Sequence, residues 1–175
     1  DMLDVGLFVT PYHDEKIVER PVFYEEMLVY AHPDCELLKK KEVGHEDIVT
    51  SDIWMLGNGH CFRNQVVNLC EMSASQHKNL PFEFESNSLE TLMRIVDVEG
   101  GFTLIPELAL QYMSPEKKKQ VRSKPLREVS VIYSRHFTKQ RLITLLCDEI
   151  KSVVPAHMLK RDRGMIVEWK AEKNE

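Results

Sequence analysis

Residues 57–70 of the 175-residue chain have the sequence GNGHCFRNQVVNLC, which combines a glycine-rich start with two cysteines. Gly57, Asn58 and Gly59 favour a sharp turn, because both residue types tolerate positive φ. Residues 62–72, FRNQVVNLCEM, contain neither Gly nor Pro and predict a short helix, with Val66, Val67 or Leu69 buried. A strand is predicted just before the turn, at residues 53–56. The stretch therefore predicts a strand, a turn and a helix that begins at or near Cys61.

The predicted position of Cys61 favours a reactive thiol. The first turn of a helix has unpaired N–H groups and the positive end of the helix dipole, and both favour an anion. His60 and Arg63 flank the cysteine, and each can carry a positive charge. Such surroundings lower the pKa of a thiol and make the thiolate available.

A second cysteine, Cys70, follows nine residues later. In a helix that spacing places the two residues on opposite faces and about 13 Å apart along the axis. A disulfide requires Cα atoms within about 7 Å of each other. The two thiols therefore cannot bond while the helix stands, and a bond between them would act as a conformational switch.

This pattern resembles the OxyR peroxide sensors, a branch of the LysR-type transcription regulators. In that family a GHC(L/F)RDQ…C segment carries a peroxide-reactive cysteine and its resolving partner at the same spacing. A second stretch, SLETLMRIVDVEGGFTLIPELAL at residues 88–110, also resembles the family. The family usually has Asp where this chain has Asn64, which removes one negative charge next to the thiol. The resemblance covers the chain from about Leu3 to Val154.

The resemblance also implies roles for individual residues. Cys61 would attack hydrogen peroxide and become a sulfenic acid, and Cys70 would condense with it to a disulfide. His60 would hydrogen-bond the sulfur or the peroxide, and Arg63 would stabilise the thiolate. The resemblance also places Arg127 near the thiol, where it would stabilise the thiolate together with Arg63, and Thr103 in a strand that would line the same pocket.

Alternating strands and helices indicate the α/β class. Two chain crossings, near Tyr30 and Val129, predict two lobes with a cleft, and the resemblance implies a periplasmic-binding-protein-like (type 2) regulatory domain. Lobe one would comprise residues 1–27 and 129–160, and lobe two residues 28–128 with both redox cysteines. Residues 161–175 would form a charged C-terminal tail.

Other local patterns give further expectations. Strands are predicted at residues 3–10, 16–21, 25–31, 82–85, 102–105 and 129–133. Helices are predicted at residues 45–48 and 139–153, and in a segment that begins with a capping box at residues 87–90 and ends at Gly100-Gly101. Two more short helices are predicted to open at Pro106 and at residues 114–115. Leu142, Ile143, Leu146, Ile150 and Val153 would face inward from the last helix, with Cys147 buried beside them. Residues 159–175 would be poorly ordered, although residues 165–169 could dock.

The sequence is expected to begin in mid-fold. The resemblance implies a preceding winged helix-turn-helix DNA-binding domain and the first β–α–β part of the regulatory domain. Promoter DNA would be bound through that missing domain. The other expected partners are a second copy of the chain, in a homodimer or homotetramer, and a thiol reductant of the glutaredoxin or thioredoxin type.

Bulk properties limit the remaining possibilities. The formal net charge of −5 argues against a chain that binds nucleic acid over its whole surface. No apolar run approaches the ~20 residues of a membrane span, and the N-terminus lacks the basic region of a signal peptide. Four cysteines without a dense framework fit a reducing compartment, so we expect a cytoplasmic protein without a membrane anchor.

Three alternatives stay open. A zinc site needs three or four ligands at characteristic spacings, and no CxxC or HxxxH element occurs, so we expect no metal and no cofactor. A thiol peroxidase would share the sulfenic-acid chemistry, although we expect a sensor rather than an enzyme. A LysR-type regulator could instead sense a small molecule in the cleft, with incidental cysteines. Cys35 is expected to be partly exposed in a polar loop.

Overall fold

The structure is a computed structural model that describes residues 3–48, 53–57, 61–73, 88–112 and 117–168, with the backbone alone for residues 61, 70–73, 111 and 112. Its strands are β1 (Val5–Thr10), β2 (Ile17–Ala31), β3 (Phe102–Pro106), β4 (Lys118–Gln120), β5 (Pro125–Ser134) and β6 (Met165–Ile166). Its helices are α1 (Glu36–Lys39), α2 (His45–Ile48), α3 (Cys61–Ser73), α4 (Leu89–Glu99) and α5 (Gln140–Val153), with 3-10 helices η1 (Glu107–Tyr112), η3 (Ala156–Leu159) and η4 (Arg161–Arg163).

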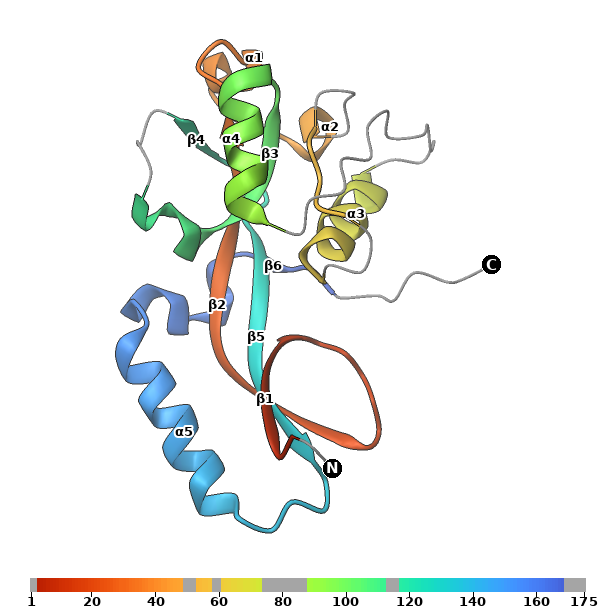
Figure 1. Ribbon diagram of the computed structural model, residues 1–175, viewed down its shortest axis with the longest axis vertical. Helices are drawn as coiled ribbons and strands as arrows, with labels where there is room; N and C mark the ends of the chain where they lie inside the picture. Colours follow the sequence, from red (N-terminus) through yellow and green to blue (C-terminus); the bar gives the residue numbers. More distant parts are fainter. Residues whose placement is uncertain (1–2, 49–52, 58–60, 74–87, 113–116, 169–175) are drawn as a thin grey trace.

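The long strand β2 organises the fold. Its residues 17–26 pair antiparallel with β5, and its residues 27–31 pair antiparallel with β3. The other edge of β5 pairs antiparallel with β1, so the strand order is β1-β5-β2-β3. Figure 1 shows β2 and β5 running side by side between an upper part, with α1 to α4, and a lower part, with β1 and α5. The α/β class is confirmed, and β2 changes partners at Met27.

The sequence predicted two strands where the structure has the single strand β2. The prediction was wrong because Pro21, which lacks an N–H donor, suggested an end to the ladder. The strand instead continues through a register shift between Pro21 and Phe23. An irregularity of this kind bends a strand without ending it.

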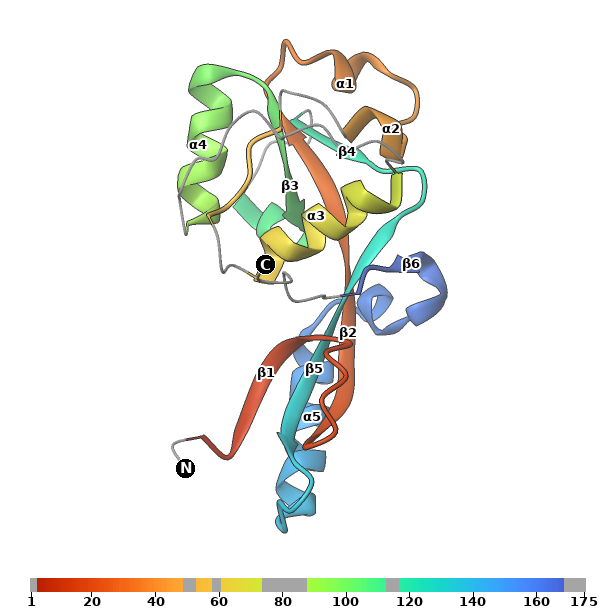
Figure 2. The same cartoon turned by 90° about the vertical axis from the view of Figure 1, so that its right-hand side faces the viewer.

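The two faces of β2 at its β3 end pack against different helices. Met27, Val29 and Ala31 belong to the core that contains the apolar residues of α3. Leu28 and Tyr30, on the other face, pack with Val96 of α4. Figure 2 shows α3 in front of β2 and β3, with α4 at the left of the upper part. α4 also contributes to the core of α3, because its Leu92 is buried in the same cluster as Phe62 and Val66.

The predicted helix after residue 87 begins one position later than expected. Ser88 is the N-cap, and its hydroxyl accepts a hydrogen bond from the amide of Thr91 at 3.3 Å. Gly100 ends α4 with φ of 85°, a conformation that glycine adopts without steric cost, as predicted. The short helix predicted to open at Pro106 begins at Glu107, since Pro106 is the last residue of β3.

The inward face of α5 is narrower than predicted. Ile143 and Cys147 are buried against the lower part of the sheet, which confirms the expected burial of Cys147. Leu142, Leu146 and Val153, however, are 55%, 40% and 80% exposed, so their predicted inward orientation is wrong. A single sheet covers one side of a helix, and the apolar residues of α5 extend around more of its circumference than that.

The remaining local predictions had mixed outcomes. The first strand, predicted at residues 3–10, begins at Val5 and pairs antiparallel with β5. The strand predicted at 53–56 is reduced to one parallel bridge between Ile53 and Phe102. The elements predicted at 82–85 and 114–115 lie outside the described residues.

The C-terminal segment is ordered further than predicted. Met165 and Ile166 form β6, which pairs in parallel with the start of β5, and Val167 is fully buried. The expected poor order is therefore wrong for residues 159–164, and the expected docking is confirmed for residues 165–168. Within the described residues, none of the helices combines the length and the apolarity required to cross a membrane.

Candidate redox site

The helix α3 carries both redox candidates. It begins at Cys61, as the sequence predicted, and runs to Ser73, so Cys70 lies on the same continuous helix. Nine residues of helix separate the two Cα atoms by about 13 Å along the axis. That separation along a standing helix is beyond the reach of a disulfide.

Apolar side chains attach α3 to the sheet. Phe62, Val66 and Leu69 are 3%, 4% and 0% exposed and pack in the same core as Met27 and Val29 of β2. Val67 is partly buried against this core. The burial predicted for the middle of the helix is thus confirmed, and α3 depends on this packing because isolated helices of its length are marginal in water.

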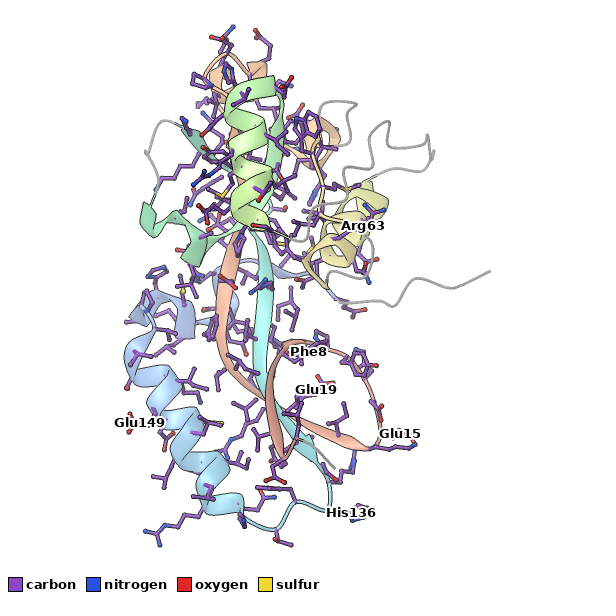
Figure 3. All side chains as sticks on the ribbon, in the orientation of Figure 1. Phe8, Glu15, Glu19, Arg63, His136 and Glu149 are labelled. Atoms are coloured by element: carbon purple, nitrogen blue, oxygen red, sulfur yellow. The ribbon has the colours of Figure 1, made fainter. Side chains whose placement is uncertain are left out.

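The segment before the helix is fixed by two predicted site residues. Thr103 donates a hydrogen bond from its hydroxyl to the carbonyl of Trp54 at 2.8 Å, and Thr103 is 2% exposed. Arg63, which projects from α3 (Figure 3), donates to the carbonyl of Leu56 at 3.4 Å. These contacts connect β3 and α3 to the segment that leads into Gly57. His60 lies outside the described residues.

Arg127 of β5 reaches the start of α3. Its guanidinium carbon is 5.6 Å from the centre of the Phe62 ring, and Phe62 is the neighbour of Cys61. Arg127 Nη2 also lies 2.7 Å from Oε1 of Glu25, a carboxylate only 1% exposed. Burial raises the pKa of Glu25, and Arg127 partly offsets this effect. The Arg127 guanidinium is therefore held by Glu25 and lies over Phe62, the residue next to the candidate thiol.

A second group of charged residues lies where β2 changes partners. Glu107 Oε1 is 2.6 Å from Nε2 of His157, and Glu107 Oε2 is 3.2 Å from Nη2 of Arg163. The amide of Glu26 donates to Glu107 Oε2 at 3.2 Å. Burial raises the pKa of Glu107, but the hydrogen bonds from His157, the Glu26 amide and Arg163 outweigh it and hold that pKa below its usual value.

Several contacting residues were not predicted from the sequence. Gln65 and Asn68 of α3 donate side-chain hydrogen bonds to the carbonyls of Val167 and Glu168, at 3.1 and 2.9 Å. Glu25 was also missed as the partner of Arg127. Gln65 stands inside the 57–70 stretch, which was the available signal, but its partner lies 102 residues further along the chain.

The remaining cysteines and possible metal ligands are readily placed. Cys147 is fully buried and Cys35 is partly exposed, as predicted, and both are free thiols. Within the described part of the chain, no group of three or more His, Cys, Asp or Glu residues is arranged to hold a metal ion.

The comparisons with known proteins agree with this architecture. The sequence pattern of the family described as "LysR substrate binding domain" matches residues 1–155, so the chain belongs to that family. More particularly, it is similar to two curated proteins. The "Hydrogen peroxide-inducible genes activator" of Haemophilus influenzae is 26% identical over 165 residues, covering 87% of this chain and 52% of that protein.

The second relative is the "DNA-binding transcriptional dual regulator OxyR" of Escherichia coli K12. It is 27% identical over 166 residues, covering 90% of this chain and 52% of that protein. The crystal structure of an OxyR mutant from Porphyromonas gingivalis has a TM-score of 0.80 and 26% identity, covering 94% of this chain and 76% of that one. The chain spans about half the length of the two curated relatives.

Proposed function

We propose that this chain is the redox-sensing regulatory domain of a LysR-type transcription regulator that detects hydrogen peroxide through a reversible Cys61–Cys70 disulfide. One observation carries the proposal: the two cysteines lie on a single helix that begins at Cys61 and holds them apart. The names of the similar proteins, which are peroxide-inducible gene activators, support the choice of peroxide.

The chemistry proceeds in two steps. The Cys61 thiolate attacks one oxygen of hydrogen peroxide, the O–O bond breaks, and hydroxide leaves and takes up a proton to become water. Cys61 is then a sulfenic acid. The Cys70 thiolate attacks the Cys61 sulfur, the S–S bond forms, and the sulfenic oxygen leaves as water. In sum, two thiols and one peroxide give one disulfide and two waters.

The neighbouring residues support the first step. His60 hydrogen-bonds the sulfur or the peroxide, and Arg63 and Arg127 supply positive charge at the start of α3. The contact of Arg127 with the Phe62 ring favours this assignment. Thr103 acts by fixing the segment before Gly57, since its hydroxyl is bonded to the Trp54 carbonyl.

The second step requires α3 to unwind. Burial of each large apolar side chain of α3 is worth about 1.5–3 kcal/mol, and this packing opposes unwinding. The disulfide favours unwinding by a comparable amount, since about 30 mV of reduction potential corresponds to 1.4 kcal/mol. The two conformations are close enough in free energy for a switch.

In the full regulator we propose that this switch is transmitted to DNA. Two or four copies of the domain associate, and a changed arrangement re-spaces helix-turn-helix domains on promoter half-sites. A thiol reductant of the glutaredoxin or thioredoxin type restores the two thiols.

Two alternatives make different predictions. A thiol peroxidase would consume many equivalents of peroxide in the presence of a dithiol, without a lasting conformational change. A regulator that senses a small molecule would keep its response to that ligand when Cys61 is replaced. Stoichiometric oxidation coupled to loss of α3 favours the sensor over both.

The test combines thiol mapping with hydrogen exchange. After one equivalent of peroxide, mass spectrometry is expected to find a Cys61–Cys70 disulfide, and amides between Val66 and Cys70 are expected to change from slow to fast exchange. Cys35→Ser is the matched control and should behave like the unmodified protein. A Cys61–Cys70 disulfide with those amides still protected would exclude the unwinding mechanism.

A further inference from the structure

The C-terminal segment that follows α5 crosses to the redox helix. After η3 and η4 the chain passes Gly164, and the amides of Met165 and Val167 donate to the carbonyls of Lys124 and Leu126, at 3.1 and 2.9 Å. A Cβ at Gly164 would collide with the carbonyl oxygen of Lys124, so glycine permits this close approach. Figure 1 shows β6 beside β5, just below α3.

Two side chains of α3 bind this segment directly. Gln65 Nε2 donates to the Val167 carbonyl at 3.1 Å, and Asn68 Nδ2 donates to the Glu168 carbonyl at 2.9 Å. Val167 is 0% exposed and packs in the same core as the apolar residues of α3. Residues three apart on a helix share one face, so Gln65 and Asn68 can reach successive carbonyls only while α3 is helical.

We propose that residues 164–168 form a strap that holds α3 in its helical conformation and is released when the disulfide forms. This inference rests on the proposed function and specifies what regulates the same site. The strap lies beyond residues 1–155, the part matched by the family. Gln65 and Asn68 are positioning residues in this view, since they act on the cysteines through the strap.

The strap separates the two steps of the reaction. Formation of the sulfenic acid at Cys61 leaves α3 helical and does not disturb the strap. Condensation with Cys70 requires unwinding, so it must break the bonds of Gln65 and Asn68 to the strap. Weakening the strap is therefore expected to accelerate condensation and to leave the first step unchanged. A merely structural role would not separate the two rates in this way.

The kinetic test compares variants of the whole chain. Gln65→Met keeps the side-chain volume and removes the donor, and loss of one such hydrogen bond is expected to accelerate condensation about fivefold. Gly164→Ala changes the strap without altering α3, and it should accelerate condensation as well. Glu168→Ala is the matched control, because Asn68 binds the backbone carbonyl of Glu168 and the Glu168 side chain is exposed. Each variant is also made with Cys70→Ser, where a sulfenic-acid probe reports the first step alone.

Hydrogen exchange provides the second readout. The amides of Met165 and Val167 should exchange slowly in the reduced protein and rapidly after one equivalent of peroxide. A Val167 amide that stays protected after the disulfide has formed, or an unchanged condensation rate in Gly164→Ala, overturns the strap and leaves the peroxide switch intact. Absence of any Cys61–Cys70 disulfide overturns both proposals.

Discussion

Arg127 and Phe62 lie in contact, with the Arg127 guanidinium carbon 5.6 Å from the centre of the Phe62 ring. The same guanidinium pairs with buried Glu25 at 2.7 Å. One side chain of β5 therefore joins the first turn of α3 to the middle of β2. A cation over an aromatic face is stabilised by the ring quadrupole, and the carboxylate fixes its orientation. The start of the redox helix is thus coupled to the two strands that cross between the upper and lower parts.

Arg127→Met is expected to destabilise the protein by about 3 kcal/mol, because it leaves Glu25 as a buried carboxylate without its cation. Urea denaturation of the reduced protein measures this change. Arg122→Met is the matched control: Arg122 and its partner Glu46 are 59% and 66% exposed, and such pairs contribute about 0–1 kcal/mol. Adding Glu25→Gln to Arg127→Met should restore part of the loss. No recovery would show that Arg127 stabilises by packing alone.

Glu107 predicts a dependence of stability on acid pH. Its folded pKa is lowered by hydrogen bonds from His157, the Glu26 amide and Arg163, despite burial. A lowered carboxyl pKa gives stability that is present above the unfolded pKa and is lost as pH falls through the folded pKa. Glu107→Gln should therefore have a lower free energy of unfolding than the unmodified protein at pH 7, by roughly 1 kcal/mol, and this difference should disappear as the pH falls through the lowered pKa of Glu107.

The difference in free energy of unfolding between the two proteins is measured by urea denaturation at a series of pH values. Glu46→Gln removes a carboxylate from an exposed pair and is the matched control, for which a small and nearly pH-independent difference is expected. If the difference between Glu107→Gln and the unmodified protein stays constant as the pH falls, ionisation of Glu107 contributes nothing to the free energy of unfolding.

Cys61 is expected to react with peroxide faster than the other thiols. Cys61→Ser should abolish peroxide-induced disulfide formation, whereas Cys35→Ser should leave its rate unchanged. Cys35 is a suitable control because it is partly exposed, as a reactive thiol must be, but the helix that follows it has only four residues and provides little positive charge at its start. Timed alkylation with mass spectrometry follows each thiol separately. Unchanged oxidation kinetics in Cys61→Ser would remove Cys61 from the proposed site.

Local sequence signals predicted the parts of the site that depend on neighbouring residues. The Gly57–Gly59 turn followed by eleven residues without Gly or Pro was sufficient to place the start of α3 at Cys61. Gly100 likewise marked the end of α4. Both signals come from backbone conformations that few residue types allow, so they survive in almost any tertiary context.

Long-range contacts could not be predicted in the same way. The pairing of Arg127 with Glu25 and the contact of Val167 with Gln65 join residues about a hundred positions apart, and nothing in either local sequence specifies the partner. The prediction of which α5 residues face inward was wrong for a related reason. Periodicity identified its apolar residues, but the sheet decides which of them are covered, and Leu142 and Val153 are not.

Leu69 gives the most direct test of how the packing of α3 controls the redox equilibrium. It is 0% exposed and lies one position before Cys70, in the core shared with β2. Leu69→Ala removes buried methyl groups, and such changes typically cost about 2–5 kcal/mol. If α3 unwinds on oxidation, Leu69 leaves the core in the oxidised protein. Leu69→Ala then destabilises only the reduced conformation, so the equilibrium shifts toward the disulfide.

The reduction potential of the Cys61–Cys70 pair should therefore become more negative in Leu69→Ala. At about 30 mV for each 1.4 kcal/mol, the lower end of the range corresponds to a shift of about 40 mV. Equilibration in glutathione or dithiothreitol redox buffers measures it. Ile143→Val is the control, because Ile143 is equally buried but packs against the lower part of the sheet, away from α3. An unchanged potential in Leu69→Ala would mean that Leu69 stays buried in the oxidised protein, and that the disulfide forms without releasing the helix.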